Sequence, residues 1–272
     1  MLLRLRESLI FAVMQVHFFK YQGTGNDFVM VDDRAGTFPV DKERIARLCD
    51  RRFGIGGDGL ILLQDDPEYD FRMKYFNADG GEGSMCGNGG RATVRFAHDL
   101  GVIGDETRFI AVDGEHEASV TPERISLKMS NVSGLEEFPG YQFMNTGSPH
   151  VVAFKENLAD FNVFDEGYAI RYASDWVARG GTNVNFAEQT GKDELFVRTY
   201  ERGVEDETYS CGTGVTASAL VSHLKLGLQS PVKIKVLGGN LEVSFSDKGN
   251  GCFEDIYLIG PAERVFEGTV DV

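Results

Sequence analysis

The sequence predicts an α/β protein of the α+β kind, made of two structurally similar domains that a pseudo-two-fold axis relates. Each domain is expected to be a curved, mostly antiparallel sheet wrapped around a central helix, with the active site in the cleft between the domains. Three observations predict this fold. They are a repeated cysteine–glycine motif, a series of short strands in each half, and a helix that is apolar on almost every side.

The repeated motif is "CGNGGRATVRFAHDLG" at 86–101 and "CGTGVTASALVSHLKLG" at 211–227. In both copies a glycine follows the cysteine, a second glycine stands three positions after the cysteine, and a final glycine closes the predicted helix. Upstream, "GTGNDFVMVD" at 23–32 matches "NTGSPHVVAF" at 145–154. This self-similarity indicates an internal duplication, so the two cysteines occupy equivalent places in the two halves.

Short segments bounded by Gly, Pro, Asn and Asp predict strands throughout both halves. In the first half they are 17–23, 27–33, 59–64, 71–77, 107–114, 116–122 and 124–130. In the second half they are 141–147, 150–155, 182–189, 195–202, 232–238, 241–247 and 255–261. Helices are predicted at 40–54, beginning near Asp41, and after each cysteine at 93–100 and 215–226. The last helix is almost wholly apolar, which favours a place inside a wrapped sheet.

The domain boundary is predicted near 129–134, where "KMSNVSG" turns polar. Residues 14–130 are assigned to the first domain and 131–260 to the second. Residues 1–13 are interpreted as an extension or an over-long start. Arg4, Arg6 and Glu7 interrupt their apolar stretch, and no small-residue cleavage site follows.

Composition disfavours several classes of partner. The chain of 272 residues has a formal net charge of −15 and no Lys/Arg-rich patch, so neither nucleic acid nor an anionic membrane is expected to bind. No apolar run approaches the roughly 18 residues of a membrane span. The four cysteines show no CxxC spacing and no close cluster with histidine. We therefore expect no disulfide framework, no metal site and a cytoplasmic location.

The chemistry expected of the motif follows from placing Cys86 and Cys211 at helix N-termini. The helix dipole and the free N–H groups are expected to lower the thiol pKa, and the same N–H groups can hold a carboxylate. If the two halves face each other, the two thiols lie on opposite sides of one bound molecule. One then removes a Cα proton and the other returns a proton to the opposite face, which inverts a stereocentre. No motif for a cofactor is present, and none is expected.

The chain resembles the diaminopimelate epimerase family in a series of motifs that cover nearly all of it after Met14. They are "GTGNDFV", "GIGGDGL", "FNADG", "MCGNGGR", "GSPH", "TNVNF", "YERGVEDETYSCGTG" and "GPAERVFEG". The resemblance implies two similar halves with the active site between them and a last strand, 261–272, that returns to the first half. It implies epimerisation of LL- to meso-2,6-diaminopimelate without pyridoxal phosphate, in lysine and peptidoglycan-precursor biosynthesis. The implied partner is a small amino-acid substrate, and a homodimer is left open.

The resemblance also implies which residues carry function. Cys86 and Cys211 match the two catalytic cysteines, and His150 and Glu201 match polar groups close to them. Residues that match the substrate site are Asn26, Asn77, Gly87, Asn88, Asn183, Glu201, Arg202, Gly212 and Thr213. The helix-end residues would receive the α-carboxylate, and Arg202 suits the distal carboxylate because its planar fork binds in a bidentate way. The oxygens of Asn77 and Asn183 can accept from the distal ammonium.

Two positions depart from the family pattern. Gly59 stands where many members have Gln, and Ser148 stands where many have Asn. Both positions are expected to touch the substrate, and a smaller residue leaves room for water or a shifted partner. The neighbouring Asp58 can be read simply as a turn cap. His98 and His223 lie in apolar helices and are interpreted as packing or hydrogen-bonded core residues rather than bases.

Three other functions stay open at this point. A proline or hydroxyproline racemase-like enzyme also uses paired cysteines, but such chains have a His where this chain has Asn88. An isomerase of the same architecture without paired thiols is disfavoured by the presence of both cysteines. A non-catalytic small-molecule-binding module is disfavoured by the presence of Glu201 and Arg202 as well. Two facing thiols also lead to the hypothesis that Cys86 and Cys211 can oxidise to a disulfide.

Overall fold

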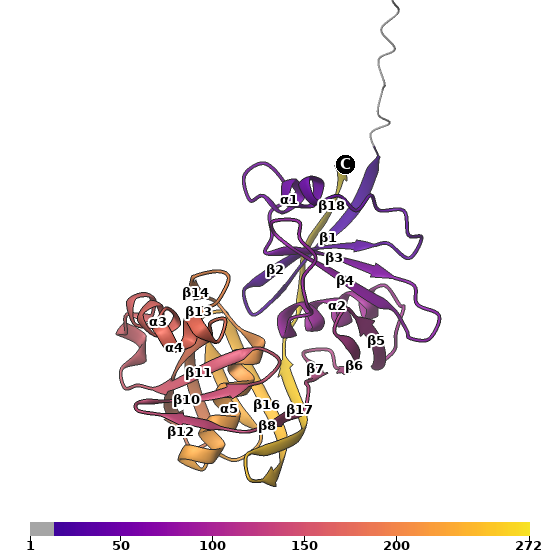
Figure 1. The fold of residues 1–272 in the computed structure, drawn as a ribbon. Coiled ribbons are helices and arrows are strands. Elements are labelled where there is room, and N and C mark those ends of the chain that lie inside the picture. Colours follow the sequence, from indigo (N-terminus) through magenta and orange to yellow (C-terminus); the bar gives the residue numbers. More distant parts are fainter. Residues whose placement is uncertain (1–13) are drawn as a thin grey trace, which may run out of the picture.

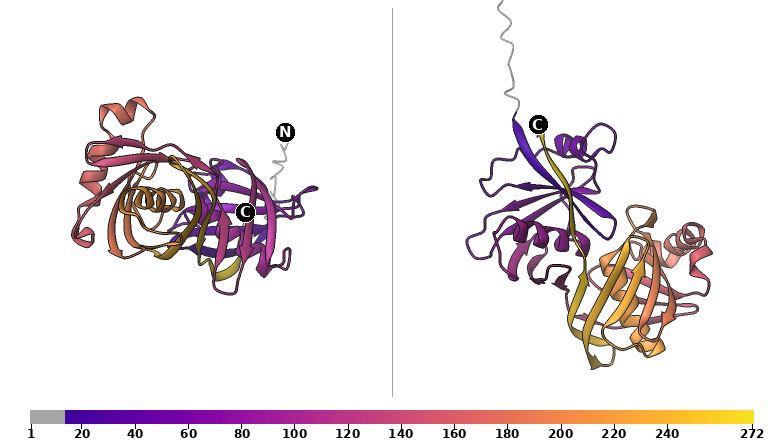
Figure 2. Two further views of the ribbon diagram at one scale, coloured as in Figure 1. Left: turned by 90° about the horizontal axis from the view of Figure 1, so that it is seen from below. Right: turned by 180° about the vertical axis from the view of Figure 1, so that it is seen from behind.

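The structure is a computed structural model that describes residues 14–272, so the extension predicted at 1–13 lies outside the described residues. Two lobes of strands lie side by side, and each surrounds one helix (Figure 1). The helices are α2 (Gly87–Asp99) in the first lobe and α5 (Gly212–Leu226) in the second. Seen along α5, the strands of the second lobe curve around the helix (Figure 2). The predicted fold class is confirmed.

Seven strands that follow one another along the chain, β1 to β7, build most of the first lobe, and each pairs with the next or with the one across a helix. The strands are β1 (Gln15–Gly23), β2 (Asn26–Asp32), β3 (Gly59–Gln64), β4 (Arg72–Asn77), β5 (Glu106–Ala111), β6 (Gly114–Val120) and β7 (Ile125–Lys128). The pairs β2–β3 and β4–β5 are parallel, whereas β1–β2, β3–β4, β5–β6 and β6–β7 are antiparallel. Helix α2 connects β4 to β5 and fills the concave side of the sheet.

The second lobe repeats this pairing in the same order and sense. Its strands are β10 (Tyr141–Asn145), β11 (Pro149–Phe154), β12 (Asn183–Gly191), β13 (Glu194–Glu201), β15 (Val232–Val236), β16 (Gly239–Gly249) and β17 (Cys252–Gly260). Here β11–β12 and β13–β15 are the parallel pairs, and β10–β11, β12–β13, β15–β16 and β16–β17 are antiparallel. The same order and sense of strand pairing in both lobes confirm the internal duplication that the two cysteine motifs predicted.

One long segment joins the two lobes. Strand β17 pairs with β7 of the first lobe and with the short β8 (Val132–Ser133). The chain then continues into β18 (Glu263–Asp271), which pairs with β1, as the yellow ribbon of Figure 1 shows. In the second lobe β9 (Glu136–Phe138) pairs with β10 just as β18 pairs with β1. All of these strands belong to one hydrogen-bonded sheet.

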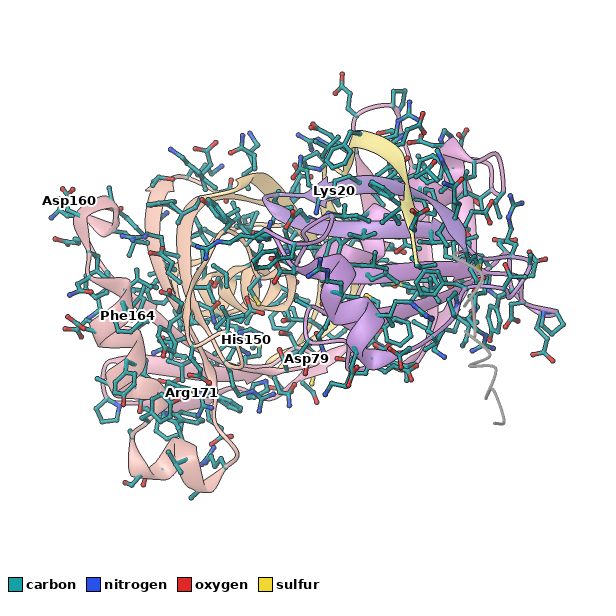
Figure 3. All side chains as sticks on the ribbon, turned by 90° about the horizontal axis from the view of Figure 1, so that it is seen from above. Lys20, Asp79, His150, Asp160, Phe164 and Arg171 are labelled. Carbon is teal, nitrogen blue, oxygen red and sulfur yellow. The ribbon has the colours of Figure 1, made fainter. Side chains whose placement is uncertain are left out.

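The helices outside the two lobe centres differ from the predictions in extent and number. Helix α1 (Lys42–Cys49) is shorter than predicted, but Asp41 caps it as expected by accepting from the Arg44 N–H at 2.9 Å. The short elements η1 (Leu158–Asp160), α3 (Val163–Arg171), α4 (Ser174–Ala178) and β14 (Asp206–Thr208) were not predicted. Figure 3 labels Phe164 and Arg171 on α3, which lies on the outer side of the second lobe.

The position of α5 inside its sheet follows from its sequence. Residues 214–222 of the helix are all buried, and the hydroxyl side chains among them bond back to the preceding turn. The hydroxyls of Thr216, Ser218 and Ser222 donate to carbonyls four residues earlier at 2.9, 2.8 and 2.6 Å. These side chains therefore bring no unpaired polar group into the core. No helix in the described part of the chain is long and apolar enough to cross a membrane.

Candidate active site

The two central helices begin next to each other, with Cys86 and Cys211 as their N-cap residues. A methyl group on Gly87 would lie 3.5 Å from the Cα of Gly212, and one on Gly212 would lie 3.2 Å from the Cα of Gly87. Both methyl groups would also strike Leu258, at 2.6 and 2.9 Å. Glycine at both positions therefore lets the helix ends converge. The free N–H groups and the positive dipole ends of both helices therefore point at the same site.

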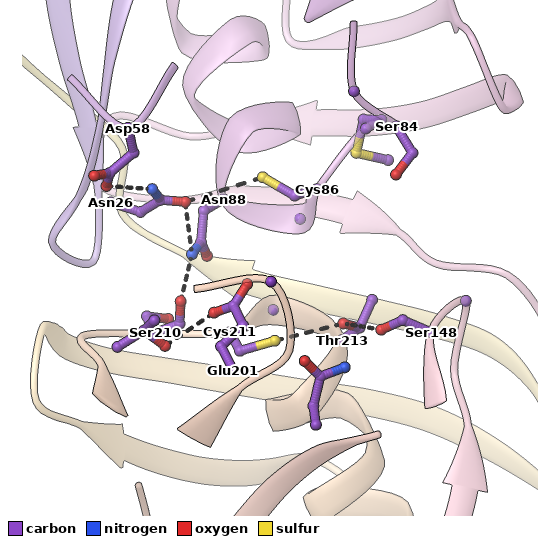
Figure 4. Close-up of a pocket in the computed structure, with 18 of the residues that line it drawn as sticks. Asn26, Asp58, Ser84, Cys86, Asn88, Ser148, Glu201, Ser210, Cys211 and Thr213 are labelled. Carbon is purple, nitrogen blue, oxygen red and sulfur yellow. Dashed lines mark hydrogen bonds between the residues drawn. The ribbon is translucent and has the colours of Figure 1, made fainter. Parts of the chain in front are cut away.

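A cavity of about 1010 Å³ opens at this place, between the two lobes. Figure 4 shows Asn26, Asp58, Cys86 and Asn88 on one wall of it, and the other wall comes from the second lobe. Twelve of the predicted site residues line the cavity: Asn26, Asn77, Cys86, Gly87, Asn88, Ser148, Asn183, Glu201, Arg202, Cys211, Gly212 and Thr213. Two predicted residues, His150 and Gly59, are not among its lining residues.

On the first wall, an amide network holds Asn26 beside the Cys86 thiol. The Asn26 side-chain nitrogen donates to Asp58 at 2.6 Å, and its oxygen faces the Cys86 sulfur at 4.0 Å and accepts from Asn88 at 3.3 Å. Asp58 is held in turn by Arg51 at 2.6 Å. Asp58 therefore does more than cap a turn. It lines the cavity and fixes which end of the Asn26 amide faces the thiol.

A fully buried arginine that sequence reasoning missed supports the same wall. Arg91 lies on α2 and donates to the Asn88 side-chain oxygen at 3.0 Å and to Thr24 at 3.2 Å. The oriented Asn88 then donates to the backbone carbonyl of Ser210 across the cleft at 3.0 Å. Burial lowers the pKa of Arg91 to about 10, so the guanidinium stays charged at neutral pH. Arg91 could have been found from the sequence, because it is the last residue of the motif "CGNGGR".

The sulfur of Cys86 accepts from the Gly89 N–H at 3.2 Å, and that of Cys211 lies 3.6 Å from the Thr213 hydroxyl. Burial nevertheless raises the pKa of Cys86 to about 11 and that of Cys211 to about 12, and the charge of Glu201 adds to both shifts. The predicted lowering of the thiol pKa values is therefore wrong for this structure. The N–H groups act in the predicted direction, but desolvation of the thiolate outweighs them.

Glu201 ends β13 and Arg202 begins the turn that follows it, and both residues line the cavity together with Cys211. Burial raises the pKa of Glu201, whose carboxylate accepts from the Thr208 hydroxyl at 2.9 Å. The Arg202 guanidinium donates to the Gly180 carbonyl at 3.1 Å, and its backbone N–H donates to the side-chain oxygen of Asn183 at 2.9 Å. One lone pair of Asn183 therefore positions this turn, and the other is left for a ligand.

His150 lies behind the wall that Thr213 and Ser148 form, and it is fully buried. Its Nε2 atom is 2.9 Å from the Thr213 hydroxyl and 2.8 Å from the Ser148 hydroxyl. Burial lowers the pKa of His150 to about 3, and the positive charge of Arg202 adds to this shift. The ring is therefore neutral, and Thr213 stands between it and the Cys211 sulfur.

Gly59 has no room for a side chain, because a methyl group there would lie 2.4 Å from both the Tyr75 ring and the Phe76 carbonyl oxygen. A methyl group on Gly83 would meet the opposite edge of the Tyr75 ring at 2.8 Å. The two glycines thus admit the ring of Tyr75, which lines the cavity. Sequence reasoning missed Tyr75, since only the pairing of β3 with β4 brings it next to Gly59.

The two histidines of the repeat are outside the cavity lining, but both are only half-buried, so the interpretation as core residues is wrong for His98, and His223 alone is held by hydrogen bonds within the described residues. His223 hydrogen-bonds the Leu228 carbonyl at 2.7 Å and Asp247 at 3.1 Å, while His98 stands near Asp99 and Asp105. Within residues 14–272, no group of three or more His, Cys, Asp and Glu side chains is arranged to hold a metal ion.

Solved structures with the same architecture define the class of this fold. A hydroxyproline epimerase from Agrobacterium vitis, solved with bound trans-4-hydroxy-L-proline, superposes with a TM-score of 0.67 at 11% identity, covering 95% of this chain and 93% of that one. A phenazine biosynthesis protein of the PhzF family from Bacillus anthracis reaches 0.76 at 15% identity, covering 95% and 100%. The chain thus has the duplicated two-domain fold of the racemase and epimerase type.

Sequence comparison is more specific. The family model for diaminopimelate epimerase matches residues 18–133 and 142–265. The diaminopimelate epimerase of Flavobacterium psychrophilum is 52% identical over 255 residues, which are 93% of this chain and 99% of the relative. That of Aquifex aeolicus is 41% identical over 94% of this chain and 98% of the relative. The chain belongs to the diaminopimelate epimerase family, as its motifs indicated, and is an isomerase of the epimerase kind.

Proposed function

We propose that this chain interconverts LL- and meso-2,6-diaminopimelate by a two-thiol proton transfer, a step of lysine and peptidoglycan-precursor biosynthesis. One observation carries the proposal: two cysteines cap two helices whose N-termini converge in one cavity. Membership of the diaminopimelate epimerase family supports the identity of the substrate. The cavity, of about 1010 Å³, has room for a diamino dicarboxylate of this size.

The α-carboxylate is placed at the converging helix ends, whose first residues Gly87, Asn88, Gly212 and Thr213 line the cavity and carry N–H groups without a helical partner. When the Cα–H bond breaks, its electron pair spreads into this carboxylate. Oriented N–H groups then stabilise the growing negative charge without reorganising. The same groups hold Cα between the two sulfurs, so that each thiol addresses one face.

Proton transfer requires one thiolate and one thiol. The thiolate takes the Cα proton and becomes a thiol, while the opposite thiol gives its proton to the other face and becomes a thiolate. Since the charge of Glu201 helps to raise both thiol pKa values, we place the substrate's α-ammonium against Glu201. Pairing that charge removes part of the penalty on the thiolate, so the substrate itself favours the reactive state.

The proposal is tested by deuterium incorporation. LL-diaminopimelate incubated with the pure protein in deuterated water is expected to gain Cα deuterium as it epimerises. The variants C86S and C211S are each expected to abolish epimerisation, and an active single variant would contradict the two-thiol scheme. Turnover of proline or hydroxyproline instead would support the racemase alternative. Binding of the substrate without any exchange would support a non-catalytic module.

We also propose a cytoplasmic location, which the need for reduced thiols supports. Cys49, Cys86, Cys211 and Cys252 are all free in the structure. If Cys86 and Cys211 can oxidise to a disulfide, activity lost in air should return with a thiol reductant. Activity that does not return with the reductant would overturn this hypothesis.

A further inference from the structure

A buried asparagine on β12 contacts the histidine that stands behind the Cys211 wall. Asn185 is fully buried, and its side-chain nitrogen is 3.0 Å from Nδ1 of His150 and 2.9 Å from the backbone carbonyl of Val151. Its side-chain oxygen accepts from the Thr199 hydroxyl at 2.9 Å. Every hydrogen-bonding group of this amide therefore points at a protein partner.

These contacts fix both the orientation of the amide and the tautomer of the imidazole. A backbone carbonyl only accepts, so the end of Asn185 that faces Val151 is the NH₂ group. The second proton of that NH₂ group points at Nδ1 of His150, which must then accept. In a neutral imidazole the other nitrogen carries the proton. His150 is consequently held with its proton on Nε2.

The second glycine of the Cys211 motif makes this arrangement possible. A methyl group on Gly214 would lie 2.2 Å from the side-chain oxygen of Asn185 and 3.2 Å from the imidazole ring of His150. Any side chain at this position would therefore displace the amide or the ring. The motif thus admits the Asn185–His150 pair against the first turn of α5, in addition to presenting its N–H groups.

The tautomer sets the direction of the hydrogen bonds toward the sulfur. The Nε2–H group faces the hydroxyls of Ser148 and Thr213, which are 3.0 Å from each other. With His150 as the donor, Ser148 can donate to Thr213, and Thr213 can donate to the Cys211 sulfur, 3.6 Å away. With the opposite tautomer, one of these hydroxyls would turn back to Nε2. A hydrogen bond donated to the sulfur stabilises the thiolate relative to the thiol.

We propose that Asn185 is a positioning residue of the reaction, because it holds His150 as a hydrogen-bond donor and thereby directs the Thr213 hydroxyl at the Cys211 sulfur. No proton moves along this series of bonds. Its effect is to favour the Cys211 thiolate over the thiol. His150 does not serve as the base for Cys211, since its acceptor nitrogen is occupied by Asn185. This inference rests on the proposed function, in which Cys211 must become a thiolate.

The tautomer can be read without any measurement of activity. Long-range ¹H–¹⁵N spectra of the uniformly labelled wild-type protein distinguish the two ring nitrogens, and H150Q identifies the signals of His150. We expect a single neutral form with the proton on Nε2, and in N185L a mixture that includes the Nδ1–H form. A wild-type spectrum with the proton mainly on Nδ1 overturns the proposal. The wild-type spectrum, assigned with H150Q, decides the tautomer even if N185L does not fold.

The effect on the sulfur is measured by alkylation with iodoacetamide, followed as the mass of the peptide that contains each cysteine. N185L is expected to slow alkylation of Cys211 about tenfold at a fixed pH, the equivalent of one pKa unit, with Cys86 as an unchanged internal reference. The exposed Asn240 on β16 offers the matched control N240L, which should change neither rate. An unchanged Cys211 rate in folded N185L overturns the proposal.

Two replacements of His150 show whether it acts as a hydrogen-bond donor or as a general base. Gln places an amide N–H near the position of Nε2 and cannot act as a base at neutral pH, whereas Leu offers neither function. We expect kcat to fall less in H150Q than in H150L, with similar KM values. Equal loss in both variants overturns the donor role. If wild-type protein does not turn over diaminopimelate, the proposed function fails, while the spectrum and the alkylation rates still decide this inference.

Discussion

The two halves share one backbone plan around their cysteines, but they place different side chains behind them. Behind Cys86 lie Phe28 on β2, Ile61 on β3 and Tyr75 on β4, and the rings of Phe28 and Tyr75 are 6.0 Å apart. The ladder pairs Ile61 directly with Tyr75. A methyl group on Gly89 would lie 3.5 Å from Ile61, an ordinary van der Waals distance. This first-half layer is therefore mainly apolar packing.

The equivalent positions of the second half hold His150 on β11, Asn185 on β12 and Thr199 on β13. Asn185 pairs with Thr199 across β12 and β13, just as Ile61 pairs with Tyr75 across β3 and β4. All three side chains are buried and hydrogen-bonded to one another or to the backbone. A buried polar layer with every partner in place is rigid and specifies one arrangement. The second half thus replaces apolar packing with bonds aimed at Cys211.

The strongest test of this difference is to make the second-half layer as apolar as the first-half layer. The triple variant H150F/N185I/T199V turns the second-half layer into an apolar one. The three side chains that bond to one another disappear together, and the partners that remain are two hydroxyls at the cavity wall and one backbone carbonyl. We therefore expect the free energy of unfolding to change by no more than about 2 kcal/mol. We expect kcat to fall by more than about tenfold, because Thr213 loses its donor. Urea unfolding and steady-state kinetics check the two parts.

A single replacement provides the contrast for this variant. N185I alone leaves the buried Nδ1 of His150 without a donor, so it should lose more stability than the triple variant does. A triple variant with wild-type kcat would show that the polar layer contributes packing alone.

The two motif glycines offer a second comparison, with a smaller effect. G214A would place a methyl group 2.2 Å from Asn185, whereas the nearest atom in G89A is the Cys86 sulfur at 3.2 Å. We expect G214A to lower the free energy of unfolding by about 1–3 kcal/mol, the usual cost of overpacking. G89A should cost less, because its nearest neighbour is 1 Å farther away than in G214A, while the helix propensity of alanine, about 1 kcal/mol better than that of glycine, helps both variants equally. Equal losses in urea unfolding would contradict the difference between the layers.

The duplication made the main features of the site predictable from the sequence. Two copies of one motif placed Cys86 and Cys211 at helix starts and at equivalent points, and convergence of the helix ends followed from that symmetry. The resemblance then supplied Glu201 and Arg202. These residues could be found because each lies in a local motif or in a segment whose pattern is legible by itself.

The parts that the sequence could not show depend on strand register or on burial. Asn185 and Tyr75 take their places only when the partners of β12 and β4 are known. The thiol pKa values follow from burial, which no local motif reports. Helix α3 was missed because Phe164 and Tyr168 are exposed, so its apolar residues do not mark a buried face.

The charge state of His150 gives a third test. Below its ordinary pKa of 6.5 the unfolded histidine binds a proton, whereas the folded one stays neutral down to about 3. The unfolded state therefore binds more protons in this window, and the free energy of unfolding falls as the pH falls. The contribution is about 1.4 kcal/mol per pH unit. H150F, which copies Phe28, should lack this loss, so the free energy of unfolding of H150F minus that of the wild type should become more positive from pH 6.5 downward. A difference that does not change with pH would show that His150 keeps its ordinary pKa in the folded protein.

The smallest expected effect concerns the two thiols themselves. The pKa of Cys86 is raised to about 11 and that of Cys211 to about 12, and Cys211 is only 8% exposed. At neutral pH without substrate both should react slowly with iodoacetamide, and Cys86 about tenfold faster than Cys211. Peptide masses separate both rates from those of Cys49 and Cys252. If pairing of Glu201 with the α-ammonium favours the thiolate, E201Q should speed the alkylation of both active-site thiols. A faster Cys211 in the wild type would show that the hydroxyls behind it outweigh its deeper burial.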